Sequence, residues 1–203
     1  MLLRSLLAAV LLLGIITPSL AQQLPGTADT SRISGGTYAV DANHTQVTWT
    51  VDHLGITPLS GMFAATSGTL VLDPAHPETA QLNVTVPISS LAVTSQSFGT
   101  DLAGPEFFDT ATFPTATFAS TRVKPDGMTA TVEGDLTLHG ITRPVTLEVT
   151  FFGAGVNPRS KRENVGFTAT GRLKRSDFGL GLAVPVVSDA VSLSIVGAFE
   201  KRP

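Results

Sequence analysis

Apolar and polar residues alternate along most of this 203-residue chain. The clearest run is 128–138, in which every even position is apolar or small and every odd position is polar. Successive side chains of a β-strand point to opposite faces, so this pattern predicts a strand with one apolar and one polar face. The same reasoning predicts strands over 45–53, 66–73, 79–86, 115–123, 128–138, 144–152, 165–173 and 191–199. The alternation is weakest in 115–123.

This series of strands predicts an all-β fold. With 37–41 joined to 45–53 as a bent first pair, the chain has eight to nine antiparallel strands that close around their apolar side. The interior of an eight-stranded barrel is either filled by side chains or able to hold one small ligand. Glycines on the apolar face fit both outcomes, because they relieve strain in a coiled strand and also leave space beside large residues. These glycines are Gly68, Gly134, Gly171 and Gly197.

One segment, 87–113, breaks the alternation and is too long for a hairpin loop. We expect short helical turns within it, around 95–102 and 105–109. The segment concentrates large apolar side chains, namely Phe98, Leu102, Phe107, Phe108 and Phe113. It is therefore predicted to be either a helical plug that closes one end of the barrel or a short helical lid over a ligand cavity.

Residues 1–21 have the features of a secretory signal peptide. Arg4 supplies a positive start, 6–16 is an apolar stretch, and small residues suit cleavage after Ala21. The apolar run ends at Pro18, short of the ~20 residues that span a bilayer. We therefore expect an exported protein with no stable membrane anchor after cleavage.

Composition narrows the function classes. Beyond the signal peptide, 22–36 is predicted to be a flexible leader and 37–201 a single domain. The chain has no cysteine, which excludes disulfides and thiolate chemistry. Its 13 Lys and Arg and 16 Asp and Glu give a net charge of −3, with no basic run that would indicate nucleic acid or an anionic membrane surface as a partner. A homodimer is left open.

Few residues are suited to catalysis. His44 and His53 are an odd number of positions apart, so on a continuous strand they point to opposite faces and do not share a metal. The chain has no His-x-His pair, no metal-ligand spacing and no Gly-x-Ser-x-Gly motif. We expect no catalytic residue, no metal and no cofactor. His53 is predicted either to bond a backbone carbonyl or to anchor a ligand head group.

Charged residues near the strand ends have a structural interpretation. Arg143, Arg172 and Lys174 could pair with an anionic head group, but charged strand ends are usually solvated. The run 175–177, Arg-Ser-Asp, is predicted to fix a turn, with Asp177 capping local amides and pairing with the arginine.

Several short motifs follow one another along the chain in the order found in a known family. They are 38–45 (YAVDANHT), 51–55 (VDHLG), 61–63 (GMF), 68–73 (GTLVLD), 86–91 (VPISSL), 106–109 (EFFD), 113–121 (FPTATFAST), 134–144 (GDLTLHGITRP), 165–167 (VGF) and 175–179 (RSDFG). In these residues the chain resembles the YceI-like proteins, which are polyisoprenoid-binding, lipocalin-like periplasmic proteins. The resemblance covers about 37–200, the whole predicted domain.

The resemblance implies an extended eight-stranded antiparallel lipocalin-like barrel with a short helical lid. Its apolar interior would hold a long-chain isoprenoid or similar lipid in the periplasm, for transport or storage. The ligand-binding residues we expect are Trp49, His53, Phe63, Leu70, Leu102, Phe107, Phe108, Phe118, Leu136, Phe151, Phe167 and Phe178. One departure is Asp101, where the family often has His. If this residue contacts the head group, an anionic head is disfavoured.

Two other functions are left open by the sequence. An enzyme could act on a lipid or an amide with His53 or His44 as base. Alternatively, a barrel with a filled core would have a structural role. A cavity below the ~300 Å³ of ordinary ligand sites would favour that structural role.

Overall fold

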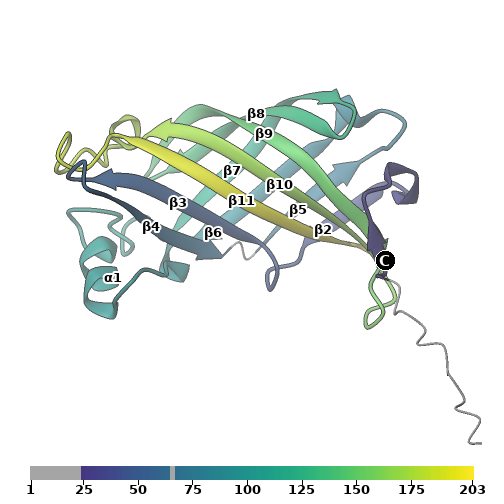
Figure 1. Cartoon of the computed structure of the whole chain (residues 1–203), viewed down its shortest axis with the longest axis horizontal. Coiled ribbons are helices and arrows are strands. Elements are labelled where there is room, and N and C mark those ends of the chain that lie inside the picture. The colour runs from purple at the N-terminus through teal and green to yellow at the C-terminus, as the bar shows by residue number, and fades with distance from the viewer. Residues whose placement is uncertain (1–23, 65–66) are drawn as a thin grey trace, which may run out of the picture.

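The computed structural model describes residues 24–64 and 67–203, so the predicted signal peptide lies outside the described residues. Antiparallel strands form an elongated barrel with one short α-helix at one end (Figure 1). The strands are β1 (Gly26–Thr27), β2 (Gly36–Val40), β3 (Gln46–His53), β4 (Thr57–Ala64), β5 (Ser67–Leu72), β6 (Gln81–Pro87), β7 (Thr115–Asp126), β8 (Thr129–Leu138), β9 (Ile141–Val156), β10 (Glu163–Lys174) and β11 (Ala190–Lys201). The helix is α1 (Gln96–Ala103), and 3₁₀ turns cover Thr30–Arg32, Pro77–Thr79, Ile88–Ser90 and Arg175–Phe178.

The strand pairing closes the barrel. From β9 the order runs β8, β7, β6, β5, β2 and β11, and β10 pairs with both β11 and β9. Both β2 and β3 pair with β11, so they form one interrupted strand, as the bent first pair predicted. The strands that follow them, β5 and β4, pair with β2 and β3 in the same way. The eight-stranded antiparallel barrel is therefore confirmed.

The predicted inward faces are also those of the structure. On β3, for example, Val47, Trp49 and Val51 line the interior, as the alternation requires. The weak pattern of 115–123 has a cause in β7. The pairing with β8 shifts by one residue between Ser120 and Arg122, which is a β-bulge.

A second register shift lies between β9 and β10, where Gly166 pairs with Gly153 but Phe167 pairs with Phe151. The extra residue is Phe152, whose side chain is 73% exposed, while Phe151 and Ala154 on either side are buried. Before the bulge the odd-numbered residues of β9 point inward, and after it the even-numbered Ala154 does. A sequence pattern of strict alternation therefore fails at this point of the strand.

The segment 87–113 differs in part from the prediction. Helix α1 confirms the expected turn at 95–102, and the Ser95 hydroxyl caps it by accepting a hydrogen bond from the backbone N–H of Phe98. The second expected helical turn, 105–109, is not a helix but a series of tight turns. The backbone N–H groups of Phe107 and Asp109 both donate to the carbonyl of Gly104, which ends α1, so the chain reverses there.

The expected flexible leader also differs from the structure within its described part, 24–36. Strand β1 pairs with β9, and the backbone around Pro25 lies so close to Gly155 that a Cβ there would be 2.1 Å from the Pro25 carbonyl oxygen. The side chain of Ile33 packs against the buried core. Short polar segments can therefore be ordered by edge pairing with a long strand, which the composition of the segment does not reveal.

The two ends of the barrel differ in the segments that cover them. One end, which we call the packed end, contains a buried cluster formed by Tyr38, Leu70, Leu72, Phe151, Ala154, Val165 and Phe199. The other, which we call the loop end, carries the β3–β4 turn, the β10–β11 loop (175–189) and α1, which lie together at the left of Figure 1. Within the described residues, no helix combines the length and apolar content needed to cross a bilayer.

Candidate ligand-binding cavity

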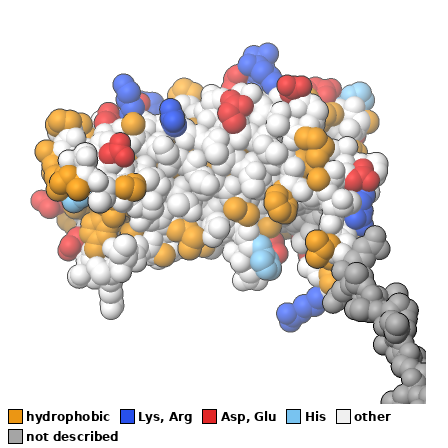
Figure 2. All heavy atoms as spheres, viewed as in Figure 1, with side chains coloured by type: hydrophobic (Ala, Val, Ile, Leu, Met, Phe, Trp, Pro, Cys, Tyr) orange, Lys and Arg blue, Asp and Glu red, His pale blue; other side chains and the backbone are white. Residues whose placement is uncertain are grey.

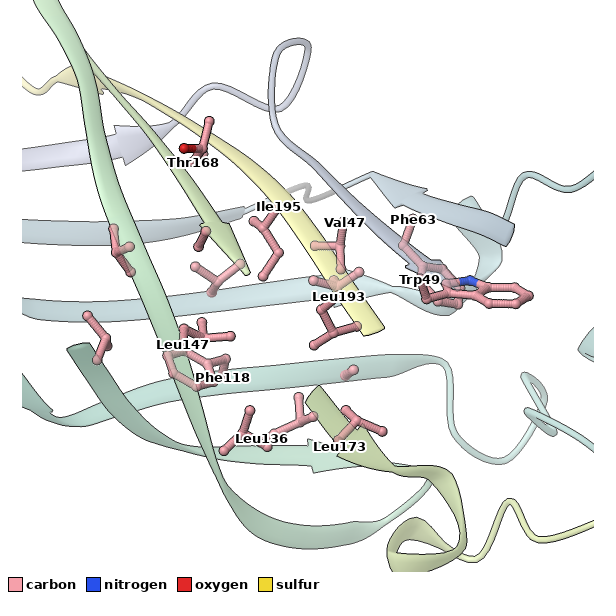
Figure 3. A pocket seen from close by; sticks show the side chains of 18 of the residues that line it. Val47, Trp49, Phe63, Phe118, Leu136, Leu147, Thr168, Leu173, Leu193 and Ile195 are labelled. Carbon is pink, nitrogen blue, oxygen red and sulfur yellow. The ribbon is translucent and has the colours of Figure 1, made fainter. Parts of the chain in front are cut away.

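A cavity of about 930 Å³ runs along the inside of the barrel. Its wall is formed by the inward apolar side chains of the strands, several of which are seen in Figure 3. It extends from Ile33 and Pro74 near the packed end to Phe107 and Leu182 at the loop end. This volume lies in the range of ~300–1,000 Å³ that is typical of small-molecule sites. The interior is therefore not filled by side chains.

Eleven of the twelve residues predicted to bind a ligand line this cavity. They are Trp49, His53, Phe63, Leu70, Leu102, Phe107, Phe108, Phe118, Leu136, Phe151 and Phe167. The twelfth, Phe178, does not line it. Its side chain is 1% exposed and packs in the core with Val132, Val145 and Leu147. Because Phe178 lies in a 3₁₀ turn and not in a strand, alternation could not assign its direction.

Two glycines of the barrel strands, Gly134 and Gly61, are covered by neighbouring aromatic rings and therefore add little open space. A Cβ at Gly134 would lie 2.3 Å from the ring of Phe118, and one at Gly61 would lie 2.2 Å from the ring of Trp49. Trp49 and Gly61 are direct cross-strand partners on β3 and β4. The indole N–H of Trp49 is buried here without a hydrogen-bond partner, so this ring is held by packing alone.

The cavity is almost free of charge. In the part of the chain that the structure describes, its only ionisable lining residues are His53, which ends β3, and Arg175, which follows β10, both near the loop end. His53 ends β3 and its backbone bridges to Val187 of the β10–β11 loop. A charge in such a low-polarity site is costly unless it is paired. The wall therefore favours an apolar molecule.

Arg175 is engaged by the protein itself. Its guanidinium donates hydrogen bonds to the backbone carbonyls of Leu180, Leu182, Val187 and Ser188, with Nε to the Ser188 oxygen at 2.9 Å. Burial lowers the pKa of this guanidinium, and the nearby Asp189 carboxylate opposes that shift. The side chain thus fixes the course of the β10–β11 loop.

The predicted turn at 175–177 is therefore real, but its partners differ from those expected. Asp189, and not Asp177, accepts from both the backbone N–H and the hydroxyl of Ser176 at 2.9 and 2.8 Å. These hydrogen bonds lower the pKa of the Asp189 carboxyl. The correct partner lies in a distant part of the loop, so local sequence could not identify it.

Helix α1 covers one side of the cavity at the loop end. The side chains of Phe98 and Leu102, one turn apart, line the cavity, and Phe108 packs edge-on against Phe63 of β4 with ring centroids 5.4 Å apart. Asp101 is exposed and does not line the cavity, so it would not contact the head group of a ligand held there. The segment acts as a packed cover.

The histidines do not form a catalytic arrangement with one another. His44 lies in the exposed turn before β3, where its Nδ1 is 2.7 Å from a carboxylate oxygen of Asp41, and it does not line the cavity. His139, in the β8–β9 turn, contacts Phe113, with ring centroids 4.3 Å apart and the rings tilted by 56°. Among residues 24–64 and 67–203, no cluster of potential metal ligands is found.

The packed end is held by a polar network that sequence analysis did not anticipate. The Tyr38 hydroxyl donates to Oε1 of Glu163 at 2.6 Å, and the Ser34 backbone N–H donates to the same oxygen at 3.1 Å. Burial, together with this carboxylate, raises the pKa of the Tyr38 phenol. Burial alone would raise the pKa of Glu163, but hydrogen bonds from Ser34 and Tyr38 outweigh it and hold that pKa low.

Several cavity residues escaped the prediction because they lie in loops or in β4. Leu59 of β4 and Leu180 and Leu182 of the β10–β11 loop all contribute to the wall. The alternation in β4 is obscured by Pro58 and by Gly61, whose space is taken by Trp49. The triplet 61–63 has no alternation of its own and is recognisable only by its resemblance to the family motif.

A closed antiparallel barrel around a large apolar cavity defines the lipocalin-like class of β-barrels. Within it, a family model described as the YceI-like domain matches residues 38–199. The chain belongs to this family. Protein YceI of Escherichia coli is 36% identical to it over 168 residues, or 81% of this chain and 87% of that protein. A UPF0312 protein of Pseudomonas putida is 39% identical over the same length and with the same coverage.

Solved structures agree with this assignment. BcnA of Burkholderia cenocepacia has a TM-score of 0.68 at 26% identity, covering 78% of this chain and 98% of that one. A YceI protein of Campylobacter jejuni has a TM-score of 0.65 at 27% identity, covering 75% and 90%. A polyisoprenoid binding domain from Saccharophagus degradans has a TM-score of 0.59 at 17% identity, covering 81% and 98%, which is a likeness of fold.

Proposed function

We propose that this protein binds a long apolar lipid of the isoprenoid type inside the barrel and carries or stores it after export to the periplasm. The observation that carries the proposal is the apolar cavity of about 930 Å³ along the barrel axis. Burial of each CH₂ group contributes about 0.8 kcal/mol, so affinity would grow with the length of the tail. The membership of the YceI-like family supports the same ligand class.

The proposed ligand has an uncharged polar group. Arg175, the one cationic side chain of the cavity wall in the described residues, already donates to four backbone carbonyls. At this end, the imidazole of His53 and the hydroxyl of Thr57 line the cavity and could form hydrogen bonds with a head group. An alcohol or a quinone carbonyl fits this site better than a diphosphate. Binding without turnover is part of the proposal.

Trp49 allows a direct test. It is the one tryptophan of the sequence and it lines the cavity, so its fluorescence should change when a lipid enters. Titration with isoprenoid alcohols of increasing length should show affinity that rises with chain length. Mass spectrometry of gently purified protein should find a co-purified lipid. An empty barrel that takes up no lipid in the titration would contradict the proposal.

A pair of variants separates the cavity from the outer wall. Ala169 of β10 lines the cavity, whereas the next residue, Thr170, is exposed on the same strand. Ala169→Phe should fill part of the cavity and weaken binding by at least tenfold, while Thr170→Phe should leave it unchanged. Equal affinity for both variants would show that the lipid does not occupy the interior. Cell fractionation of the full-length chain tests the periplasmic location.

A further inference from the structure

The loop end of the barrel exposes a group of apolar side chains. Of the described residues, the large apolar ones with high exposure here are Leu54, Ile56, Leu182, Val184 and Val186. Ile56 is 77% exposed. Figure 2 shows hydrophobic side chains gathered at this end, where Figure 1 places the β3–β4 turn and the β10–β11 loop. We call these five residues the apolar rim.

The two loops that carry the apolar rim form one unit. The backbone N–H of Leu54 donates to the carbonyl of Val186 at 2.9 Å, and the N–H of Ser188 donates to the carbonyl of Asp52 at 2.9 Å. Arg175 fixes the second loop through its bonds to four carbonyls. The exposed apolar residues are therefore held in place by the fold.

The apolar rim is continuous with the cavity. Leu182 is 47% exposed to solvent and also lines the cavity, and its neighbour Ala183 lines it as well. In the other loop, His53 and Thr57 line the cavity on either side of the exposed Leu54 and Ile56. A molecule that moves between the cavity and this surface would contact apolar side chains throughout.

The β3–β4 turn keeps a leucine where the backbone disfavours it. Leu54 has φ 59° and Gly55 has φ 64°, and the N–H of Ile56 donates to the carbonyl of His53. Two central residues with positive φ form a type I′ turn, for which Asn-Gly is the preferred sequence. A bulky residue in the left-handed region is strained. An apolar residue kept at the turn despite this backbone strain indicates that the side chain of Leu54 contacts something other than the barrel itself.

From these observations we propose that the apolar rim docks on the surface of a lipid bilayer, so that the ligand passes between membrane and cavity at the loop end. The proposal rests on the proposed function, because an apolar ligand of this kind resides in membranes. Apolar side chains exposed on two adjacent loops, at the mouth of an apolar cavity, can insert among lipid head groups and place that mouth at the bilayer surface. The lipid surface is therefore the occupant to which the geometry points.

The charges at this end predict which membranes are bound. Residues 33–121, which include the β3–β4 turn and α1, contain seven Asp and Glu and no Lys or Arg. The β3–β4 turn and α1 therefore provide no attraction to anionic lipids, and the exposed cations Arg172 and Lys174 lie on β10 outside the apolar rim, so docking would depend on apolar insertion. Binding should be undiminished by salt, because ionic screening does not weaken apolar burial.

The test compares vesicle binding by two double variants. Leu54→Asn with Ile56→Ser removes one tip of the apolar rim, and neither residue lines the cavity. Val71→Ser with Val196→Ser removes two exposed valines from the strands of the outer wall. On phosphatidylcholine vesicles, the first variant should partition at least tenfold less than the unmodified protein. The second should bind within twofold of it, since it leaves the rim intact.

The turn chemistry makes this test robust. Asn is preferred at the position of Leu54, so the rim variant should fold at least as stably as the unmodified protein. Its cavity binding, measured by Trp49 fluorescence with a dispersed isoprenoid alcohol, should be unchanged. Its rate of lipid uptake from vesicles should fall at least tenfold. If cavity binding persists and vesicle binding is equal in all three proteins, docking is wrong and the proposed function stands.

Two further outcomes would also overturn the proposal. Loss of vesicle binding between about 0.05 and 0.5 M NaCl would show an electrostatic surface elsewhere on the molecule. Concentration-dependent dimerisation that the rim variant abolishes, with no vesicle binding by any protein, would assign the apolar rim to a second copy of the chain. Absence of cavity binding in the unmodified protein would instead contradict the proposed function.

Discussion

At the packed end of this barrel a cluster of apolar side chains is buried, whereas at the loop end several large apolar side chains are exposed. At the packed end, a buried tyrosine, Tyr38, and a carboxylate, Glu163, are bonded to each other beneath the segment 24–36. At the loop end, apolar side chains such as Ile56 are left exposed, and the half-buried guanidinium of Arg175 donates hydrogen bonds to backbone carbonyls. The packed end thus supplies stability, and the loop end supplies a defined surface next to the cavity.

The difference between the ends shows how one sheet can support both tasks. The same strands, β10 and β11, run between both ends, with Glu163 at one end of β10 and Arg175 just beyond the other. At each end a single polar side chain organises a non-strand segment by hydrogen bonds. Substitutions at Arg175, Tyr38 and Glu163 should affect these two hydrogen-bond networks independently, with the largest loss of stability expected at Arg175.

Arg175→Ala should give the largest loss of stability. It leaves the carbonyls of the β10–β11 loop without donors, and hydrogen bonds from charged groups contribute about 1.5–3 kcal/mol each. We expect a loss of about 3 kcal/mol in the free energy of unfolding by urea, partly relieved by water entering the loop. The exposed Arg172→Ala is the control and should cost less than about 0.5 kcal/mol. Equal effects would mean that Arg175 does not hold the loop.

Tyr38→Phe tests the packed end. The ring remains buried, but Glu163 loses one hydrogen bond while those from Ser34 remain. The expected cost is about 1 kcal/mol in urea unfolding. Binding of lipid in the cavity and of vesicles at the loop end should not change. A variant that loses vesicle binding would show that the two ends are coupled, which their separate hydrogen-bond networks do not predict.

The pH dependence of stability should give the smallest effect. Because the pKa of Glu163 is lower in the folded protein than its usual value of 4.5, its contribution is complete above about pH 4.5. It is lost as the pH falls further, through the folded pKa. The group is partly exposed, so we expect about 0.5 kcal/mol. The free energy of unfolding of Glu163→Gln should be lower than that of the unmodified protein at pH 7, and this difference should shrink toward pH 3. A constant difference would contradict the assignment.

The sequence predicted the barrel wall well because strand geometry forces a period of two. Residues such as Leu136 and Phe167 could be assigned to the interior with no knowledge of their neighbours. The prediction failed where a contact from another strand or loop decides the outcome. The bulge at Phe152 turns Ala154 inward, and the alternation of β4 is obscured because Trp49 fills the space above Gly61.

The hydrogen-bond networks at the two ends could not be predicted from the pattern of apolar and polar residues. Arg175 was recognised as a turn residue, but its acceptors are backbone carbonyls up to 13 positions away, which have no side-chain signature. Glu163 and Tyr38 are 125 positions apart and belong to strands of ordinary composition. Periodicity predicts which way a side chain points, and it does not predict its hydrogen-bond partner.

The position of the chain's ends has a practical consequence. Strand β1 near the start of the described chain and the last residues, beyond Lys201, both lie at the packed end, opposite α1 (Figure 1). A C-terminal tag attached to a sensor surface would therefore present every molecule with its loop end facing outward. Immobilised this way, the protein forms an oriented layer, in which vesicle capture reports on one end of the barrel alone.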